Sequence, residues 1–209
     1  MLFCTGALNT NAVMHWCIAG FLQMSFQLAH YKLNGSSAST YESAANAHYK
    51  HGRTETVRSA TTLSHAFCET MCDPQASAAD KGAAMRAAIM NHGKLTKEAM
   101  TGAGWGRHLF ALKWIAEEQG ELAPELYAGK AYATLANVVL PTSTLNSPAL
   151  DGGGFGPVGP DCFGIGYGTR DADGTARFNV TSFGLENKRF IECLEESLLY
   201  RTTTQTRVC

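Results

Sequence analysis

The segment "FGIGYGTRDADGTARFNVTSF", residues 163–183, decides the fold class of this 209-residue chain. Two runs of strand-forming residues, 163–168 and 176–183, flank an Asp-Gly pair at 173–174. An Asp-Gly turn between two such runs predicts a β-hairpin, whose strands are antiparallel. The other predicted elements do not alternate in the regular strand–helix–strand order of a doubly wound fold. We therefore predict an α/β fold in which a mixed β-sheet is flanked by helices.

The remaining elements follow from periodicity and from helix- or strand-forming composition. Gly35 ends the first predicted helix, since glycine accepts the left-handed conformation of a C-terminal cap. Trp105, Leu109, Leu112 and Ala116 recur at helical spacing, so we expect an amphipathic helix with a buried apolar face there. Helices are predicted at 21–33, 62–71, 76–100, 106–119 and 186–201, and further strands at 39–43 and 55–58.

Composition excludes several classes of protein. With 45% hydrophobic residues the chain can bury a sizeable core, so wholesale disorder is not expected. The formal net charge is −1 without a long run of like charge, which argues against a nucleic-acid binder. Residues 1–30 contain neither the basic region of a signal peptide nor an unbroken apolar run of about eighteen residues. No targeting signal and no membrane span are therefore predicted.

The cysteines and histidines do not form a recognisable metal site. Cys68 and Cys72 are separated by three residues, a looser spacing than that of paired zinc ligands. The odd count of seven cysteines indicates reduced thiols in an intracellular compartment. No third ligand follows His48 and His51, and none of the seven histidines lies in an H-x-x-x-D sequence. We predict no metal site.

Polar donors are dense in "STYESAANAHYKHGRTETVRS", residues 39–59. Guanidinium and hydroxyl donors match the oxygens of a carboxylate or phosphate, so this segment fits a clamp for a small anion. The alternative is an ordinary strand–turn–strand with polar faces. The candidate donors are Tyr41, Ser43, Arg53, Thr54, Thr56 and Arg58.

Three later segments are also candidates for function. "TGAGWG" at 101–106 lacks the spacing of a phosphate loop, so its glycines predict close backbone packing; Arg107 follows at a helix N-terminus, which favours an anion. "PTSTLNSP" at 141–148 carries four hydroxyls, which either satisfy their own turn or donate to a developing oxyanion. The glycine-rich loop around Phe155 is either a tight structural loop or one wall of a narrow cleft.

Five segments, taken in order, resemble motifs of the carnitine/choline acyltransferase family. The resemblance runs from about Gly20 to Phe183. It implies the chloramphenicol acetyltransferase-like fold of the C-terminal domain of carnitine acyltransferases. Residues 1–209 are then a single partial domain, the carboxy-terminal half of a choline/carnitine acyltransferase domain. The segments are "TYESA" (40–44), "GRTETVRS" (52–59), "AMTGAGWGRHLFALK" (99–113), "LPTSTLNSP" (140–148) and "GGGFGPVGPDCFGIGY" (152–167).

The resemblance implies a carnitine site. Tyr41 and Thr54 would donate to carnitine's carboxylate, with Arg107 as the countercharge, and Ser43 would line the site. Phe155 would face the trimethylammonium group. Relatives that use choline typically have an apolar residue in place of the threonine of the "GRT" motif. Because Thr54 and Arg107 are both present here, carnitine is expected rather than choline.

The resemblance also implies roles in acyl transfer. Ser143 would stabilise the tetrahedral oxyanion, although Pro141 stands where family members commonly have serine. Thr144 would lie near the pantetheine arm of coenzyme A. Gly153, two residues before Phe155, would leave an acyl tunnel open, which implies medium- or long-chain acyl groups and a role in fatty acid metabolism.

The chain departs from the family in its catalytic base. That base is a histidine in an H-x-x-x-D sequence well upstream of the Tyr-Glu-Ser motif, and neither His15 nor His30 matches it. The lysines that bind coenzyme A phosphates are also missing from "LNTNAVMHWCIAGF". The expected function is the substrate-binding half of a carnitine O-acyltransferase, inactive alone. The alternative is a non-catalytic carnitine-binding remnant.

The expected partners follow from the same resemblance. Acyl-coenzyme A and carnitine would be substrates, no cofactor is implied, and the missing amino-terminal half would be a protein partner. The chain would then be a fragment or a shortened gene model. The family resemblance implies a mitochondrial or peroxisomal location.

Overall fold

The computed structural model describes residues 2–7, 15–121, 124–144, 147, 149–150, 152–170 and 175–203. A mixed six-stranded β-sheet forms the centre of this part of the chain. The strand order is β1-β6-β5-β4-β2-β3. The β5/β4 and β4/β2 pairs are parallel and the other three pairs are antiparallel, so the predicted mixed sheet is confirmed. The strands are β1 (Leu2–Ala7), β2 (Thr40–Ala45), β3 (Thr54–Val57), β4 (Leu140–Thr144), β5 (Gly164–Arg170) and β6 (Thr175–Thr181).

The hairpin predicted from residues 163–183 is confirmed by the antiparallel pairing of β5 with β6. Its turn, at 171–174, lies outside the described residues. The strands predicted at 39–43 and 55–58 correspond to β2 and β3 and also pair antiparallel. The "STYESAANAHYKHGRTETVRS" segment is therefore a strand–turn–strand, which was one of the two interpretations of its sequence.

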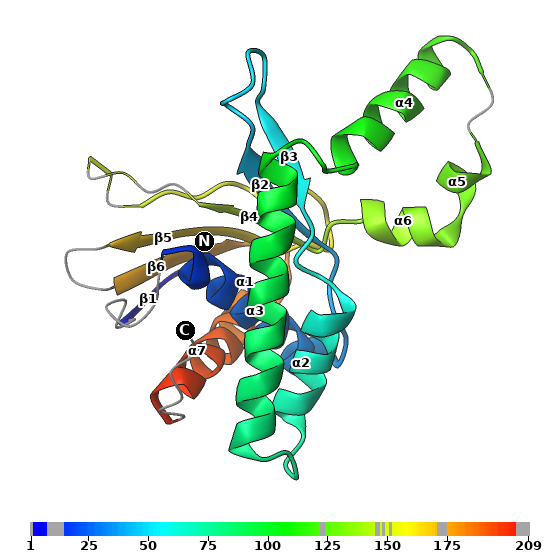
Figure 1. The fold of residues 1–209 in the computed structure, drawn as a ribbon. Coiled ribbons are helices and arrows are strands. Elements are labelled where there is room, and N and C mark those ends of the chain that lie inside the picture. The colour runs from blue at the N-terminus through cyan, green and yellow to red at the C-terminus, as the bar shows by residue number, and fades with distance from the viewer. Residues whose placement is uncertain are drawn as a thin grey trace.

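Four helices, α1 (His15–Asn34), α2 (Thr62–Cys72), α3 (Ala78–Met100) and α7 (Asn187–Thr203), form a layer beside the sheet (Figure 1). They match the predicted helices at 21–33, 62–71, 76–100 and 186–201. Thr61 and Ser77 begin α2 and α3 with capping boxes, in which side chain and backbone satisfy each other's free groups. Within the described residues, no helix combines the length and apolar character needed to cross a membrane.

Helix α1 is buried on every side between residues 20 and 30. The ring of Phe26 makes edge-on contacts with Tyr167 of β5 and Phe178 of β6, at 5.4 and 5.9 Å between centroids. Helices α3, α7 and α2 cover its other sides. Its polar side chains consequently find internal partners: Gln23 donates to Thr142, and Gln27 donates to the Ala38 carbonyl, both at 2.8 Å.

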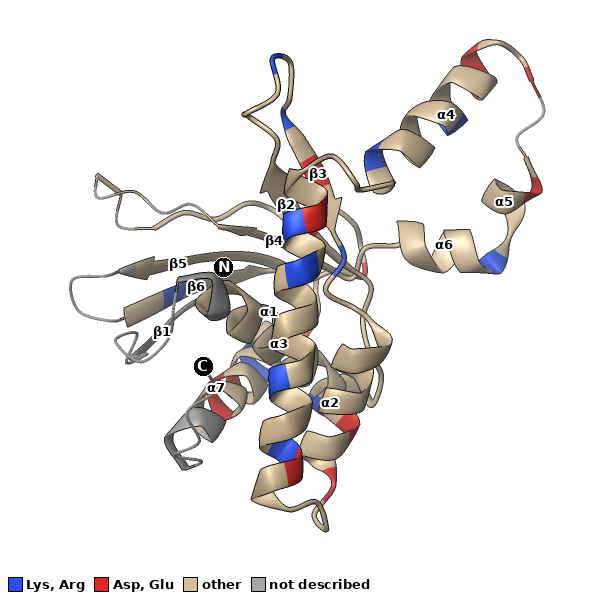
Figure 2. Ribbon diagram, in the orientation of Figure 1, with Lys and Arg blue, Asp and Glu red and all other residues tan. Residues whose placement is uncertain are grey.

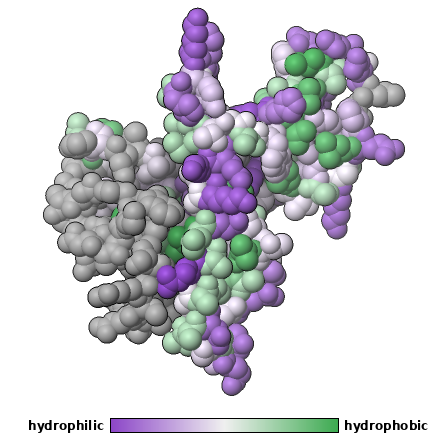
Figure 3. Space-filling model, in the orientation of Figure 1, coloured by the Kyte–Doolittle hydropathy of each residue, from purple (hydrophilic) through white to green (hydrophobic). Residues whose placement is uncertain are grey.

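A separate arm, which follows α3 in the chain and leads into β4, projects from the body (Figure 1) and consists of α4 (Gly106–Glu118), α5 (Glu125–Ala128) and α6 (Lys130–Ala136). The helix predicted at 106–119 is confirmed, but the prediction of a buried apolar face is wrong. None of the arm's three helices contains a buried residue, and green apolar atoms gather on the arm's surface in Figure 3. Helix α4 reaches the sheet through its first turn, where Arg107 contacts Tyr41 of β2 and Thr54 of β3, and most of the helix lies away from the sheet (Figure 1).

Charged residues are spread over the helices in both signs. In the view of Figure 2 the described residues form no continuous basic face, in keeping with the net charge of −1.

Candidate functional site

Alternation along β2 separates two groups of polar side chains. Thr40, Glu42 and Ala44 are buried toward the helix layer, whereas Tyr41 and Ser43 are more exposed and lie on the opposite face. We call this opposite side the open face of the sheet. Antiparallel pairing with β3 places Thr56 beside Ser43 and Thr54 beside Ala45 in register, so the polar residues of both strands share the open face.

Arg107 joins these strands from the first turn of α4. Its Nη2 donates to the hydroxyl of Tyr41 and, at 3.3 Å, to Oγ1 of Thr54. Its guanidinium carbon also lies 5.5 Å from the centroid of the Tyr41 ring, within the range of a cation–π contact. The structure thus brings together three of the residues predicted to bind a carboxylate. We call Tyr41, Thr54 and Arg107 the clamp.

A cavity of about 160 Å³ lies beside the clamp, between the sheet edge and the arm. Tyr41 and Arg107 line it, together with Thr56, Arg58 and Tyr132. Arg58 has a structural role here, because its Nη1 donates to the Thr40 and Leu135 carbonyls at 2.8 and 3.1 Å. Burial lowers the pKa of Arg58, in part offset by nearby acidic groups.

Ser143 and Thr144 are the last two residues of β4, and both are exposed. Tyr41 is paired with Pro141 across the parallel β2/β4 ladder, so two-residue alternation puts Ser143 on the same open face as the clamp. On the other side of β4, Ser143 is in register with Gly166 of β5. The predicted oxyanion donor and the predicted carnitine donors therefore face one surface of the sheet.

The glycine-rich loop crosses this open face over β5 and β6. A Cβ atom at Gly166 would lie 2.7 Å from the carbonyl oxygen of Gly153, so backbone rests directly on backbone there. A Cβ at Gly164 would lie 3.2 Å from the ring of Phe155, whose carbonyl accepts from Thr181 Oγ1 at 2.8 Å. Phe155 is half-buried and stands on the same face as Ser143, while Gly153 itself is exposed. The loop is thus both a tightly packed segment and one boundary of the open face.

Comparison with known proteins identifies the family of this chain. Residues 14–196 match the family model described as choline/carnitine O-acyltransferase. The chain belongs to this family. It is 44% identical to "Carnitine O-palmitoyltransferase 2, mitochondrial" of Xenopus tropicalis and 42% identical to the protein of that name from Homo sapiens, each over 84% of this chain. It is 36% identical, over 93% of its length, to the "Putative mitochondrial carnitine O-acetyltransferase" of Saccharomyces cerevisiae. It spans only 27–28% of the length of these relatives.

In this acyltransferase-family chain, sequence reasoning missed a buried polar cluster behind the clamp. The carboxylate of Glu42 lies 2.8 Å from Nε2 of His92 on α3 and accepts from the hydroxyl of Tyr167 at 2.9 Å. Burial, followed by the charge of Glu42, raises the pKa of Tyr167 well above its usual value. The signal was present in "TYESA": if Tyr41 and Ser43 face the site, alternation requires the glutamate between them to face the interior.

Glu55 was missed as well. Its Oε1 accepts from the backbone N–H groups of Thr56 and Arg107 at 2.6 and 3.1 Å. A Cβ at Gly104 would lie 2.2 Å from Cγ of Glu55. The close backbone packing predicted for "TGAGWG" is therefore confirmed, and the glutamate is the neighbour against which it packs.

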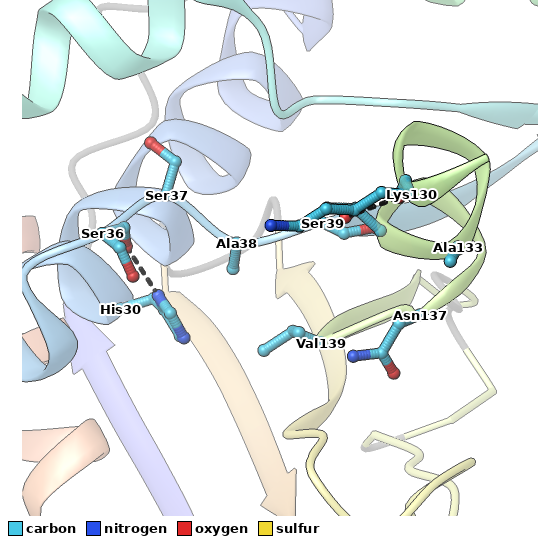
Figure 4. Close-up of a pocket in the computed structure, with 10 residues that line it drawn as sticks. His30, Ser36, Ser37, Ala38, Ser39, Lys130, Ala133, Asn137 and Val139 are labelled. Carbon is cyan, nitrogen blue, oxygen red and sulfur yellow. Dashed lines mark hydrogen bonds between the residues drawn. The ribbon is translucent and has the colours of Figure 1, made fainter.

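A second cavity, of about 400 Å³, opens at the amino-terminal ends of β2 and β4 (Figure 4). It lies between the segment leading into β2 and helix α6, where Oγ of Ser39 donates to the Leu135 carbonyl at 3.2 Å. The ring of His30 is hydrogen-bonded to the Ser36 carbonyl at 2.9 Å, and burial lowers its pKa against the raising effect of that bond. None of the predicted site residues lines this cavity, so it is distinct from the clamp.

Proposed function

We propose that this chain supplies the carnitine-binding and oxyanion-stabilising part of a coenzyme A-dependent carnitine O-acyltransferase. The convergence of Arg107, Tyr41 and Thr54 carries the proposal. A carboxylate can accept from a guanidinium and two hydroxyls at once, and the guanidinium supplies the countercharge. Carnitine has such a carboxylate, whereas choline does not. Ser43 on the same face would line the bound molecule.

The chemistry proposed is acyl exchange between the thiol of coenzyme A and the hydroxyl of carnitine. A general base removes the hydroxyl proton, the oxygen attacks the thioester carbonyl, and the thiolate leaves and is protonated. Ser143 would donate to the oxyanion that forms in between. Thr144, the next residue, would lie near the pantetheine arm. Phe155 would face the trimethylammonium group, a contact of roughly 1–2 kcal/mol when desolvated.

The general base is proposed to come from outside these 209 residues. The family's H-x-x-x-D sequence does not occur in the chain, which spans about a quarter of its relatives' length. The missing amino-terminal part of the enzyme would then be its partner, and the complete cleft would lie between the two. The alternative function is a carnitine-binding remnant without catalysis. It is supported by the same observation, that these 209 residues contain no H-x-x-x-D sequence.

For the acyl substrate we propose a medium or long chain. Gly153 has no side chain to close an acyl tunnel, and each methylene buried there would contribute roughly 0.8 kcal/mol. A relative 44% identical over most of the chain is named for palmitoyl transfer. In an assembled enzyme, palmitoyl- and octanoyl-coenzyme A should be preferred to acetyl-coenzyme A, and Gly153→Met should shift the preference toward acetyl. A preference of the unaltered enzyme for acetyl would contradict this proposal.

We also propose a mitochondrial location and a role in fatty acid metabolism. Two relatives that match over most of the chain carry the word mitochondrial in their names. Imaging of the tagged protein against mitochondrial and peroxisomal markers tests the location.

The clamp is tested by NMR titration of the chain with L-carnitine and, separately, with choline. Arg107→Asn should weaken carnitine binding at least about tenfold, because a hydrogen bond to a charged group contributes about 1.5–3 kcal/mol. Thr54→Val should weaken it less. Neither change should affect choline, which has no carboxylate. Arg53→Asn, an exposed arginine of the same hairpin, is the matched control. Equal effects of Arg53→Asn and Arg107→Asn would contradict a specific clamp.

A further inference from the structure

The position of Arg107 depends on how the first turn of α4 is held. No residue of α4 is buried, so packing along the helix does not fix it. The residue before the helix, Trp105, makes no side-chain capping hydrogen bond. The first N–H groups of a helix have no partner within the helix and need one from elsewhere. The side chain that meets this need comes from β3.

Glu55 provides that partner. Its carboxylate accepts from the N–H of Arg107 in α4 and from the N–H of Thr56 in β3 through the same oxygen, Oε1. The side chain is buried, with 8% of the residue exposed. A negative charge is favoured at a helix N-terminus, where the backbone dipoles leave partial positive charge. One carboxylate thus joins the sheet edge to the start of the arm.

The loop before α4 is shaped around this carboxylate. At Gly104 a Cβ would collide with Cγ of Glu55, at 2.2 Å, and at Gly106 it would lie 3.3 Å from Oε1. Residues larger than glycine would push the loop away from β3. The hydrogen bonds and the two glycines are independent observations of one closely packed joint.

We propose that Glu55 is a positioning residue for the clamp: by anchoring the first turn of α4 to β3, it holds the guanidinium of Arg107 against Tyr41 and Thr54. The inference rests on the proposed function only in naming carnitine as the ligand. Glu55 acts through the backbone of Arg107 and not on the substrate. Its loss therefore affects recognition of the carboxylate, while an aromatic contact with the ammonium group persists.

The test uses the full chain with Glu55→Ala and Glu55→Gln, titrated with L-carnitine and with choline. Glu55→Ala should reduce carnitine affinity by about tenfold or more and change choline affinity less than about twofold, since only carnitine uses Arg107. Glu55→Gln keeps a neutral acceptor and should fall between wild type and Glu55→Ala. Glu117→Gln, an exposed carboxylate on the same helix, is the matched control and should behave as wild type.

Hydrogen exchange of the first turn of α4 gives a second readout that needs no ligand. Glu55→Ala should accelerate exchange there by about tenfold, because the capping acceptor is lost, while the core helix α1 stays protected. The proposal is overturned if Glu55→Ala leaves both the exchange rate of α4 and the carnitine affinity at their wild-type values. It is also overturned if Glu55→Ala lowers the affinity for carnitine and for choline equally. If wild-type protein binds neither ligand, the proposed function fails, and the exchange result alone decides the role of Glu55.

A variant at Gly104, which packs against Glu55, tests whether the effect comes from this contact and not from Glu55 alone. Gly104→Ala should displace the loop and lower carnitine affinity in the same direction. The double variant with Glu55→Ala should lose no more than the larger single loss, because both remove the same joint. Full additivity of the two losses would count against the proposal.

Discussion

The buried cluster behind β2 offers the most decisive test of how the sheet is held together. Glu42 accepts two hydrogen bonds, from Tyr167 and from His92, and lies between two residues of the open face. Glu42→Leu removes the acceptor and leaves both donors buried without a partner. Tyr167→Phe removes only one donor and keeps the ring contact with Phe26. The two substitutions should therefore differ in cost.

The magnitudes follow from the partners lost. Tyr167→Phe gives up the hydrogen bond to the Glu42 carboxylate, about 1.5–3 kcal/mol of unfolding free energy, and with it the hydrogen bond between the phenol and Gln23. Glu42→Leu gives up two and strands two donors, roughly 3–5 kcal/mol, the range found when one partner of a buried pair is removed. Combining the two should cost less than their sum, because the phenol stranded by Glu42→Leu is then gone.

Urea unfolding followed by circular dichroism measures these differences, with equal slopes required for comparison. Glu98→Leu, which removes an exposed carboxylate paired with Lys94 at 3.8 Å, is the control and should change stability by less than about 1 kcal/mol. If Glu42→Leu is as stable as wild type, the desolvation of the carboxylate outweighs its hydrogen bonds, and the stabilising role argued here is refuted.

Three further outcomes are expected. The purified 209-residue chain should show no release of thiol from acyl-coenzyme A with carnitine, because acid–base catalysis alone contributes about 10²–10⁴-fold; turnover proportional to protein concentration would contradict this. At pH 8, iodoacetamide should modify exposed Cys72 at least about tenfold faster than Cys68, whose thiol is fully buried with its pKa raised by burial to about 12; equal rates by mass spectrometry would show that α2 opens readily. The raised pKa of Tyr167 means that the folded state favours the neutral phenol. The contribution of this phenol to stability is therefore complete below about pH 10 and is lost as pH rises toward the folded-state pKa. Urea unfolding of Tyr167→Phe should not show this loss of stability at alkaline pH.

The local elements were readable from the sequence because their signals are local. The Asp-Gly turn predicted the β5/β6 pair, and the polar alternation of residues 39–59 predicted β2 and β3. The clamp also emerged at this stage, since Tyr41, Thr54 and Arg107 stand in motifs that resemble the acyltransferase family. The structure brings the three side chains together, and their role in binding carnitine stays a prediction.

The features that could not be predicted from the sequence depend on contacts between distant segments. Gln23 and Gln27 are buried in α1 because they find hydrogen-bond partners on β4 and before β2, and the local sequence does not reveal these partners. His92 is paired with a glutamate fifty residues earlier in the chain, which no spacing rule links to it. The apolar periodicity of α4 predicted burial, yet burial needs a neighbour, and the described part of this chain gives α4 little beyond its first turn.

The glycines of β5 bear on which changes the family can tolerate at this site. Where the loop rests on Gly166, the contact is between main-chain atoms, and any added side chain would collide at 2.7 Å. Gly154 is confined in the same way, by the side chain of Asn179 at 2.6 Å. The carbonyl oxygen of Gly153 is the atom that meets Gly166. A side chain at 154 or 166 could therefore be accommodated only together with a second change, because the neighbouring side chain or backbone must move first.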